Sequence, residues 1–367
     1  MASRLRLLAE RGQSVWIDNL SRELVHGGGL RRLMDEHAVT GVTSNPTIFQ
    51  RAIAGGADYD DQLRALLERE EDPREVFFRL AEDDVRDACD VLRPVWERTG
   101  GGDGYVSIEV DPGLAYDVEG TFEQALELHE AIDRPNLLVK IPATVPGLAA
   151  IEECIARGRS INVTLIFSLA RYRAVVEAYL RGLERLVAGG GDPSRVASVA
   201  SFFVSRVDTE TDRRLEELGR PELAGRLAIA NARLAYRHFE EAFAGPRWAF
   251  LAGKGASKQR PLWASTSTKN PAYRDVLYVE ELVGPDTVDT MPPETVEAFA
   301  DHGEVRGDTV VEGVAEAERL LGELRAAGID YDDVVETLED EGVRRFADSF
   351  GELLDGIRAK RAELAHA

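Results

Sequence analysis

A single lysine interrupts an apolar run that otherwise has the character of a buried strand. The run is LLVKIPAT, residues 137–144, and the lysine is Lys140. Burying an ammonium group is costly unless the group is paired or neutral. Desolvation disfavours the charged form, so an amine in such a place can be neutral. A neutral amine attacks a carbonyl carbon and forms a Schiff base, which serves as an electron sink for cleaving the adjacent carbon–carbon bond.

Carboxylates, amides and hydroxyls stand near the ends of neighbouring apolar runs. Glu109 lies in YVSIEVDP, and Asn162 and Thr164 lie in SINVTLIF. Asp18 lies near the end of SVWIDNL, and Asn45 ends AVTGVTSN. Because strand side chains alternate between two faces, most of these polar groups fall on one face together with Lys140. Their positions toward the carboxyl ends of the strands match the place where barrel enzymes hold catalytic groups.

Spacing alone leaves a purely structural explanation open. Lys140 could form an ion pair with Glu109 or with Asp18 and perform no chemistry, since structural ion pairs also perturb pKa values. The pattern by itself therefore favours amine chemistry only weakly.

The elements that must position these residues alternate between short apolar runs and longer helical patterns. Strand, helix, strand in repetition implies parallel pairing with right-handed crossovers. Eight such units predict a (β/α)8 barrel; an open doubly wound sheet is the alternative, although no G-x-G-x-x-G follows the first strand. The expected strands are residues 14–20, 38–45, 105–112, 137–144, 160–167, 196–205, 260–266 and 287–292.

Two stretches fit the repeat poorly. Residues 51–99 form an acidic, helix-rich insertion, and residues 304–367 contain no strand candidate. We expect residues 1–303 to form the catalytic barrel and residues 304–367 to form a helical extension packed on it. An apolar stripe at helical spacing supports a packed helix there: Val343, Phe346, Phe350, Leu353 and Ile357.

Composition limits the classes of partner. The net charge of −22 and the pI near 4.8 argue against nucleic acids and anionic membranes. With no run of 18 apolar residues and no signal-like start, we expect a cytoplasmic protein. Cys89 and Cys154 are too few for a disulfide framework, and the six histidines lack metal-binding spacing, so we expect no metal and no cofactor.

Seven motifs together resemble the transaldolases, Schiff-base aldolase relatives of the pentose phosphate pathway, in their longer bacterial form. They occur in the order of that family and extend over residues 14 to about 305. The motifs are SVWIDNL, GVTSNPTIF, VSIEVDP, LLVKIPAT, INVTLIFSLARY, SFFVSRVDTETD and LWASTSTKNPAY.

The resemblance implies a role for each matching residue. Lys140 corresponds to the lysine that forms the Schiff base, and Asp18 to the acid/base at the cleaved bond. Glu109 and Thr164 correspond to the pair that positions a water for proton transfer. The amides that hold the dihydroxyacetone end of the substrate correspond to Asn45 and Asn162.

The resemblance also implies a phosphate-binding end. Ser201 and Arg206 match phosphate-binding residues, and Phe203 matches a pocket wall between them. Ser265 fits a serine of the family, whereas Lys269 replaces an arginine at different spacing and would act as a point charge. Two alternatives concern neighbouring residues: Arg206 could instead pair with Asp208 or Asp212, and the segment GKGASK, residues 253–258, could add phosphate contacts or be a solvated loop.

The resemblance implies transfer of a dihydroxyacetone unit from sedoheptulose 7-phosphate or fructose 6-phosphate to glyceraldehyde 3-phosphate or erythrose 4-phosphate. A simple aldolase that releases free dihydroxyacetone is a close alternative. A barrel that binds sugar phosphates without catalysis is a more distant one. We expect sugar-phosphate substrates and a monomer or a homodimer.

Overall fold

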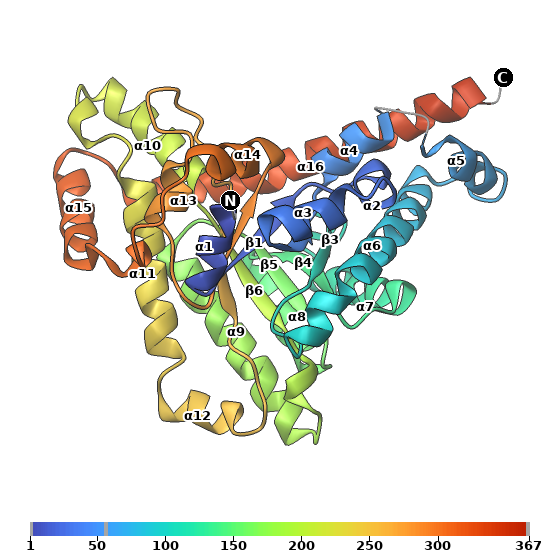
Figure 1. The fold of residues 1–367 in the computed structure, drawn as a ribbon, viewed down its shortest axis with the longest axis horizontal. Helices are drawn as coiled ribbons and strands as arrows, with labels where there is room; N and C mark the ends of the chain where they lie inside the picture. Colours follow the sequence, from blue (N-terminus) through green and yellow to red (C-terminus); the bar gives the residue numbers. More distant parts are fainter. Residues whose placement is uncertain (1–2, 55–57, 365–367) are drawn as a thin grey trace.

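Eight parallel strands close into a barrel in a computed structural model, which describes residues 3–54 and 58–364 (Figure 1). Each strand pairs with its neighbour in sequence, and β8 pairs with β1. The predicted (β/α)8 barrel is therefore confirmed, and the open doubly wound sheet is excluded by the pairing of β1 with β8. The strands are β1 Gln13–Asp18, β2 Val39–Thr43, β3 Val106–Glu109, β4 Leu137–Pro142, β5 Ile161–Ile166, β6 Ser198–Phe203, β7 Arg260–Ala264 and β8 Thr287–Met291.

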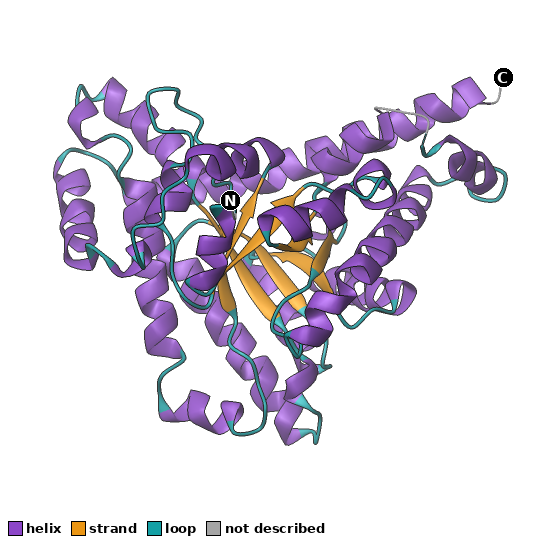
Figure 2. Ribbon diagram, in the orientation of Figure 1, coloured by secondary structure: helices purple, strands orange, loops and turns teal. Residues whose placement is uncertain are grey.

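Helices surround the strands and make up most of the outer surface (Figure 2). None of these described helices combines the length and the apolar character needed to cross a membrane. The helices are α1 Leu5–Glu10, α2 Arg22–His26, α3 Gly29–His37, α4 Pro46–Ala54, α5 Asp60–Leu67, α6 Pro73–Arg98, α7 Val118–Ile132, α8 Val145–Ala156, α9 Leu169–Ala188, α10 Ser205–Glu217, α11 Leu227–Ala242, α12 Pro246–Ala252, α13 Leu277–Glu281, α14 Pro293–His302, α15 Val314–Ala326 and α16 Tyr331–Leu364.

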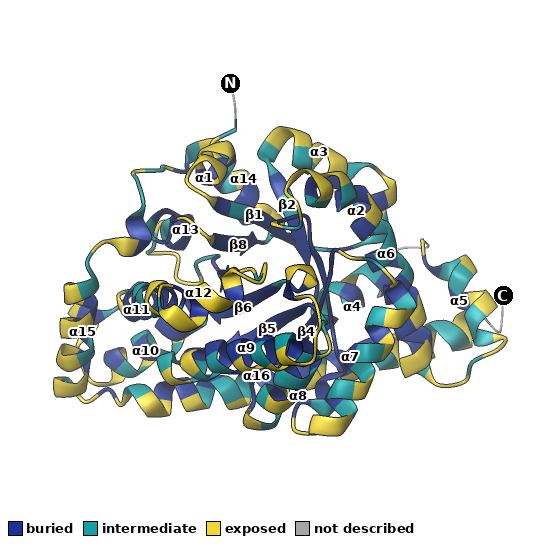
Figure 3. Ribbon diagram, turned by 90° about the horizontal axis from the view of Figure 1, so that it is seen from below, coloured by how far each residue is buried: buried dark blue, intermediate teal, exposed yellow. Residues whose placement is uncertain are grey.

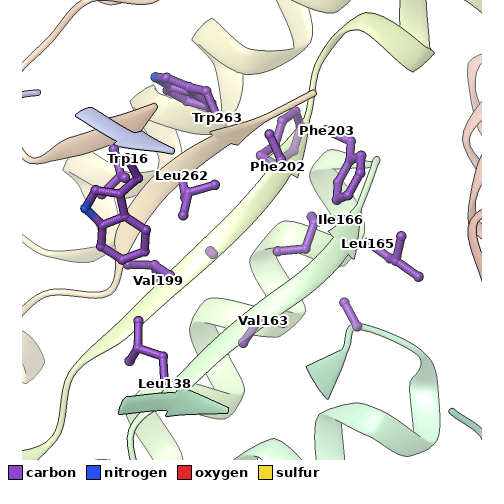
Figure 4. Packing of buried hydrophobic residues seen from close by; sticks show 14 of the residues in the cluster. Trp16, Leu138, Val163, Leu165, Ile166, Val199, Phe202, Phe203, Leu262 and Trp263 are labelled. Carbon is purple, nitrogen blue, oxygen red and sulfur yellow. The ribbon is translucent and has the colours of Figure 1, made fainter. Parts of the chain in front are cut away.

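The strands are buried on both faces, which explains their nearly continuous apolar sequences. Figure 3 shows the central strands dark blue and the exposed residues on the outer sides of the helices. Side chains from three strands, Trp16, Leu138 and Val199, gather inside one end of the barrel (Figure 4). The barrel is thus a filled core, as its alternating inward residues require.

The register of the central strands brings the predicted polar residues into neighbouring positions. Glu109 on β3 is paired with Lys140 on β4, and Lys140 is paired in turn with Asn162 on β5. Thr164 lies two residues beyond Asn162, toward the carboxyl end of β5, and is paired with Pro142. The successive pairing of β3, β4 and β5 therefore brings together residues as distant as Ser107 and Asn162, which are hydrogen-bonded although they are 55 positions apart in the chain.

The carboxyl end of β5 departs from regular geometry. The pairing register with β6 shifts between Val163 and Ile166, and Leu165 has a φ of +59°. A left-handed conformation is disfavoured for a branched residue and is held in place by its surroundings. Here Leu165 and Phe167 pack against the backbone of Gly342 in α16, where an added Cβ would lie 3.1 Å from the Leu165 side chain.

The long helix α16 passes over the carboxyl ends of the strands and alongside α4 (Figure 1). Phe350 makes edge contact with Phe77 of α6, and Ser349 accepts a hydrogen bond of 3.0 Å from Thr47 of α4. At its start, the Tyr331 hydroxyl donates to Asn231 at 2.7 Å. All members of the predicted apolar stripe are buried: Val343, Phe346, Phe350, Leu353 and Ile357.

A glycine in β2 provides a test of how tightly the barrel is filled. The backbone of Gly41 lies against the ring of Trp16, and a Cβ there would approach the ring to 2.4 Å. Because overpacking of a dense core costs roughly 1–3 kcal/mol or more, we expect Gly41→Ala to lower the free energy of unfolding by at least that amount.

The matched control is Gly351→Ala in α16, where an added Cβ meets no atom within 4 Å. This change is expected to raise stability by about 0.5–1 kcal/mol, because alanine is the better helix former. Denaturant midpoints measure both changes, and a Gly41→Ala variant as stable as the parent would contradict the packing described here.

Candidate active site

A cavity of about 680 Å³ opens at the carboxyl ends of the strands. Most of the predicted site residues lie in its wall: Asp18, Asn45, Lys140, Thr164, Ser201, Phe203, Arg206, Ser265 and Lys269. Glu109 and Asn162 are not in the wall but contact residues that are. No group of three or more His, Cys, Asp or Glu side chains among the described residues is arranged to hold a metal ion.

The amine of Lys140 is buried yet borders this cavity. The residue is only 5% exposed, and its Nζ donates a hydrogen bond of 3.1 Å to the carbonyl oxygen of Ser44. Glu109 Oε2 lies 3.5 Å from the same nitrogen. The ion pair with Glu109 considered from the sequence is thus present, but it leaves the amine in contact with a space large enough for a ligand.

Two groups beside the amine are buried without protein hydrogen bonds. Neither carboxylate oxygen of Glu109 has a hydrogen-bond partner among the described residues, and the same holds for the hydroxyl of Thr164. Burial raises the pKa of Glu109 to about 7, although the charge of Lys140 acts in the opposite direction. A carboxyl group with such a pKa can both accept and donate a proton near neutral pH.

Asp18 is oriented by two threonines that sequence reasoning did not assign to the site. The Thr43 hydroxyl donates to Asp18 Oδ1 at 2.6 Å and lies 2.7 Å from the hydroxyl of Thr290. Burial raises the pKa of Asp18, and the charge of Lys140 and the Thr43 hydrogen bond act against this rise. Thr43 is the last residue of β2 and Thr290 the last but one of β8, and their position at the carboxyl ends of strands was the available signal.

The two predicted amides occupy different positions. Asn162 is fully buried behind the wall, where it donates to Ser107 at 3.0 Å and accepts from the Ser201 hydroxyl at 2.7 Å. Asn45 lies in the wall, and its Oδ1 accepts from the backbone N–H of Ile48 at 3.1 Å, which caps α4. Asn162 therefore reaches the cavity through Ser201, whereas Asn45 borders it directly.

Arg206 lies in the first turn of α10, near the positive end of the helix dipole. Its guanidinium carbon lies 5.2 Å from the centre of the Phe203 ring, and the ion pairs of the described residues do not include Arg206. Burial lowers the pKa of Arg206. The alternative pairing with Asp208 or Asp212 is wrong, because these carboxylates accept hydrogen bonds from Tyr278 and Tyr273 instead.

The loop after β7 supplies further polar groups to the same end of the cavity. Ser265 has a φ of +59°, and its hydroxyl lies 2.9 Å from that of Ser205. Lys269 is exposed and donates to the Ser267 hydroxyl at 2.7 Å. Ser267 also borders the cavity and was not singled out from the sequence.

The segment at residues 253–258 has no place in this site. It precedes β7 and therefore lies at the amino end of that strand, opposite the cavity that holds Lys140. Ser257 and Lys258 instead line a second cavity at the amino ends of the strands, together with Arg260. The idea that this segment adds phosphate contacts in the catalytic cavity is therefore wrong.

The tail contributes a wall residue that sequence reasoning placed only on an apolar stripe. Phe346 of α16 borders the cavity beside Ile48 and Ala52 of α4. A residue more than 200 positions beyond Lys140 thus shapes the catalytic cavity. Helical periodicity predicts burial of Phe346, but not the cavity that it faces.

Comparison with known proteins places this site in a family. The family model described as Transaldolase/Fructose-6-phosphate aldolase matches residues 15–357. The chain belongs to this family. The transaldolase of Acidothermus cellulolyticus is 56% identical over 359 residues, which cover 97% of this chain and 96% of that protein. The transaldolases of a Parafrankia species and of Saccharopolyspora erythraea are 53% and 54% identical and match at least 97% of both chains.

The predicted resemblance to transaldolases is therefore confirmed. The chain is a transferase of the transaldolase type, and sugar phosphates are the substrates that this family implies. A barrel without catalytic function, the distant alternative, loses its support.

The raised pKa of Glu109 predicts how activity depends on pH. Its carboxyl group is protonated below pH about 7 and ionised above it. Only the ionised carboxylate of Glu109 can accept a proton from a group beside it, such as the Lys140 nitrogen at 3.5 Å, so we expect kcat/KM to fall as pH drops below about 7. Initial rates from roughly pH 5.5 to 8.5 measure this limb.

Glu109→Gln is the control, since it keeps the shape but cannot ionise. We expect a lower rate in which the limb near pH 7 is absent. A variant that keeps an unchanged limb would show that another group is responsible.

Proposed function

We propose that Lys140 is the nucleophile of a transaldolase reaction. The observation that carries this proposal is a buried amine that borders the cavity and is paired at 3.5 Å with Glu109, a carboxylate that has no hydrogen-bond partner among the described residues. In the proposed first step the neutral amine attacks C2 of a ketose phosphate and forms a carbinolamine. Loss of water then gives the Schiff base.

Glu109 and Thr164 carry the protons of these steps in the proposal. Both have buried oxygens without hydrogen-bond partners among the described residues. Glu109 is paired with Lys140 in the strand register, and Thr164 lies two positions beyond Asn162, which is paired with Lys140 on the other side. A water held between them would accept the proton released by the attacking amine. The same water would return a proton to the departing hydroxyl of the carbinolamine.

Asp18 acts as the base for carbon–carbon cleavage. It removes the proton of the C4 hydroxyl while the C3–C4 bond breaks, and the electron pair moves into the Schiff base to give an enamine. The aldose phosphate leaves, and the three-carbon unit remains on Lys140 until an acceptor aldehyde binds. The hydrogen bond from Thr43 supports this role, because it fixes the Asp18 carboxylate in the cavity wall.

Arg206 and Ser201 hold the phosphate, with Ser265 and Lys269 beside them and Phe203 as the wall. Support comes from a half-buried cation without an ion pair among the described residues at the start of a helix. Asn45 and Asn162 hold the dihydroxyacetone end in this proposal, and Asn45 borders the cavity directly. Contacts to the remote phosphate orient the bond that is cleaved.

We also propose the finer features of organisation. Residues 1–303 form the catalytic barrel with a helical insertion at 51–99, and residues 304–367 form an extension. Within residues 3–54 and 58–364 the last strand ends at Met291, which supports this division. Two free, buried cysteines fit a reducing cytoplasm. We expect a monomer or a homodimer, and light scattering with the purified protein would decide between them.

Chemical trapping tests the nucleophile and the reaction class together. Borohydride with fructose 6-phosphate should reduce the Schiff base and leave a stable three-carbon adduct on Lys140, located by peptide mass spectrometry. Lys140→Ala should keep the fold but lose the adduct and the activity. Without an acceptor, a stoichiometric burst supports transfer, whereas steady release of dihydroxyacetone supports an aldolase.

Lys258→Met is the matched control, because Lys258 lies at the opposite end of the barrel. This variant should form the adduct as the parent does. An unmodified Lys140 under turnover conditions, or an adduct on another lysine, would refute the proposal.

Arg206 and Lys269, the two cations of the phosphate end, should contribute differently to substrate affinity. Truncating one partner of a desolvated charge pair costs roughly 2–5 kcal/mol, so Arg206→Ala should raise KM for fructose 6-phosphate on the order of a hundredfold. Exposed ion pairs contribute roughly 0.2–1 kcal/mol, so Lys269→Ala should raise KM no more than about fivefold. Steady-state kinetics at constant ionic strength measure both, and a larger effect at Lys269 would contradict this assignment.

A further inference from the structure

A buried carboxylate lies behind the phosphate end of the cavity and has no part in the chemistry described so far. Asp289 on β8 is 0% exposed and is absent from the cavity wall, although the next residue, Thr290, is part of it. Its Oδ1 accepts a hydrogen bond of 2.8 Å from the hydroxyl of Thr266, and its Oδ2 has no partner among the described residues. A buried carboxylate is costly, so a hydrogen bond that ties it to a functional loop needs an explanation.

The partner of Asp289 directly follows the strained residue of the β7 loop. Thr266 is fully buried, and the preceding Ser265 has a φ of +59°. A left-handed conformation at a residue other than glycine persists only where surrounding contacts hold it. On the side toward Asp289, the described contacts of Thr266 are the Asp289 carboxylate and a long 3.5 Å approach to the carbonyl oxygen of Thr290.

The other side of the same loop is fixed to the start of α10. The backbone N–H of Val204 donates to Ala264 at 2.9 Å, and that of Ser205 donates to Ser265 at 3.0 Å. The hydroxyls of Ser205 and Ser265 also lie 2.9 Å apart. Arg206, the half-buried cation of the phosphate end, is the next residue along the chain.

We propose that Asp289 is a positioning residue that holds the β7 loop, through Thr266, in the conformation that presents Ser265 to the substrate phosphate. This inference rests on the proposed function, because it takes the Arg206 end of the cavity as the phosphate site. Asp289 and Ser205 hold the loop from opposite sides, so the loop and the start of α10 form one rigid anion-binding surface. The loop groups that this arrangement orders are Ser265, Ser267 and Lys269.

Removing either hydrogen-bonding partner should weaken phosphate recognition more than chemistry. We expect Thr266→Val and Asp289→Leu to raise KM for fructose 6-phosphate about tenfold and to change kcat by less than about threefold. Inorganic phosphate, used as a competitive inhibitor, should lose affinity by a similar factor. Thr266→Ser keeps the hydroxyl and Asp289→Asn keeps an acceptor oxygen, so both should remain near the parent values.

Thr287→Val is the matched control for loss of a buried threonine hydroxyl. Thr287 is fully buried at the amino end of β8, where its hydroxyl donates to Gly284 at 2.5 Å. This variant should lose stability but keep the KM and the phosphate affinity of the parent. Should Asp289→Leu fail to fold, Thr266→Val decides the question, because it replaces one hydroxyl by a methyl group of similar size.

Two outcomes would overturn the proposal. Thr266→Val could melt earlier yet show unchanged KM and unchanged inhibition by phosphate, which would make the contact merely structural. Alternatively, kcat and borohydride trapping at Lys140 could fall together with no change in phosphate affinity. Failure of the parent enzyme to trap substrate at Lys140 would refute the proposed function instead, and the phosphate titrations of the variants would still test the contact with Asp289.

Discussion

The buried amine of Lys140 constrains the groups around it, because an amine inside a closed barrel must be either paired or neutral. The Lys140 nitrogen has one hydrogen bond to a carbonyl oxygen and one carboxylate, Glu109, at 3.5 Å. A tighter ion pair would neutralise the ammonium charge but would fix the amine away from a substrate. The observed arrangement is intermediate, because Glu109 is close enough to exchange a proton with the amine and too weakly bonded to hold it. Its pKa near 7 follows from the same burial that excludes water from the amine.

Barrel closure makes this arrangement possible with residues that are distant in the chain. Each strand delivers its last polar residues to the same end, so Asp18, Glu109, Lys140 and Thr164 meet although they belong to four different strands. The helices and loops that follow the strands complete the cavity. Helix α16 then passes over this end and adds Phe346, which links the extension to the shape of the catalytic cavity. Packing of α16 on the barrel therefore contributes both to the buried core and to the shape of the cavity.

The sequence predicts the strands and most of the site because both depend on local patterns. Alternation within LLVKIPAT places Lys140 on the inner face, and parallel pairing then places Glu109 beside it. Features that arise from contacts between distant segments could not be predicted in this way. The left-handed conformation of Leu165 depends on packing against Gly342, and the hydrogen bond from Thr266 to Asp289 depends on the pairing of β7 with β8.

The net negative charge of the chain repels an anionic substrate, whereas the cationic side chains in the cavity wall attract it. The chain carries a net charge of −22, yet its substrates are sugar phosphates. Salt screens charges beyond roughly 8–10 Å, so the overall repulsion is weak at physiological ionic strength. Contacts within the cavity are screened much less, and Arg206, Lys269 and Arg51 in its wall form no ion pair with a described residue. Many arginines on the outer helices are by contrast paired with neighbouring carboxylates, as Arg247 is with Glu177 and Glu184. In the proposed function, recognition of the phosphate therefore comes from short-range contacts inside the cavity, and the position of the loop after β7 relative to the start of α10 sets their geometry.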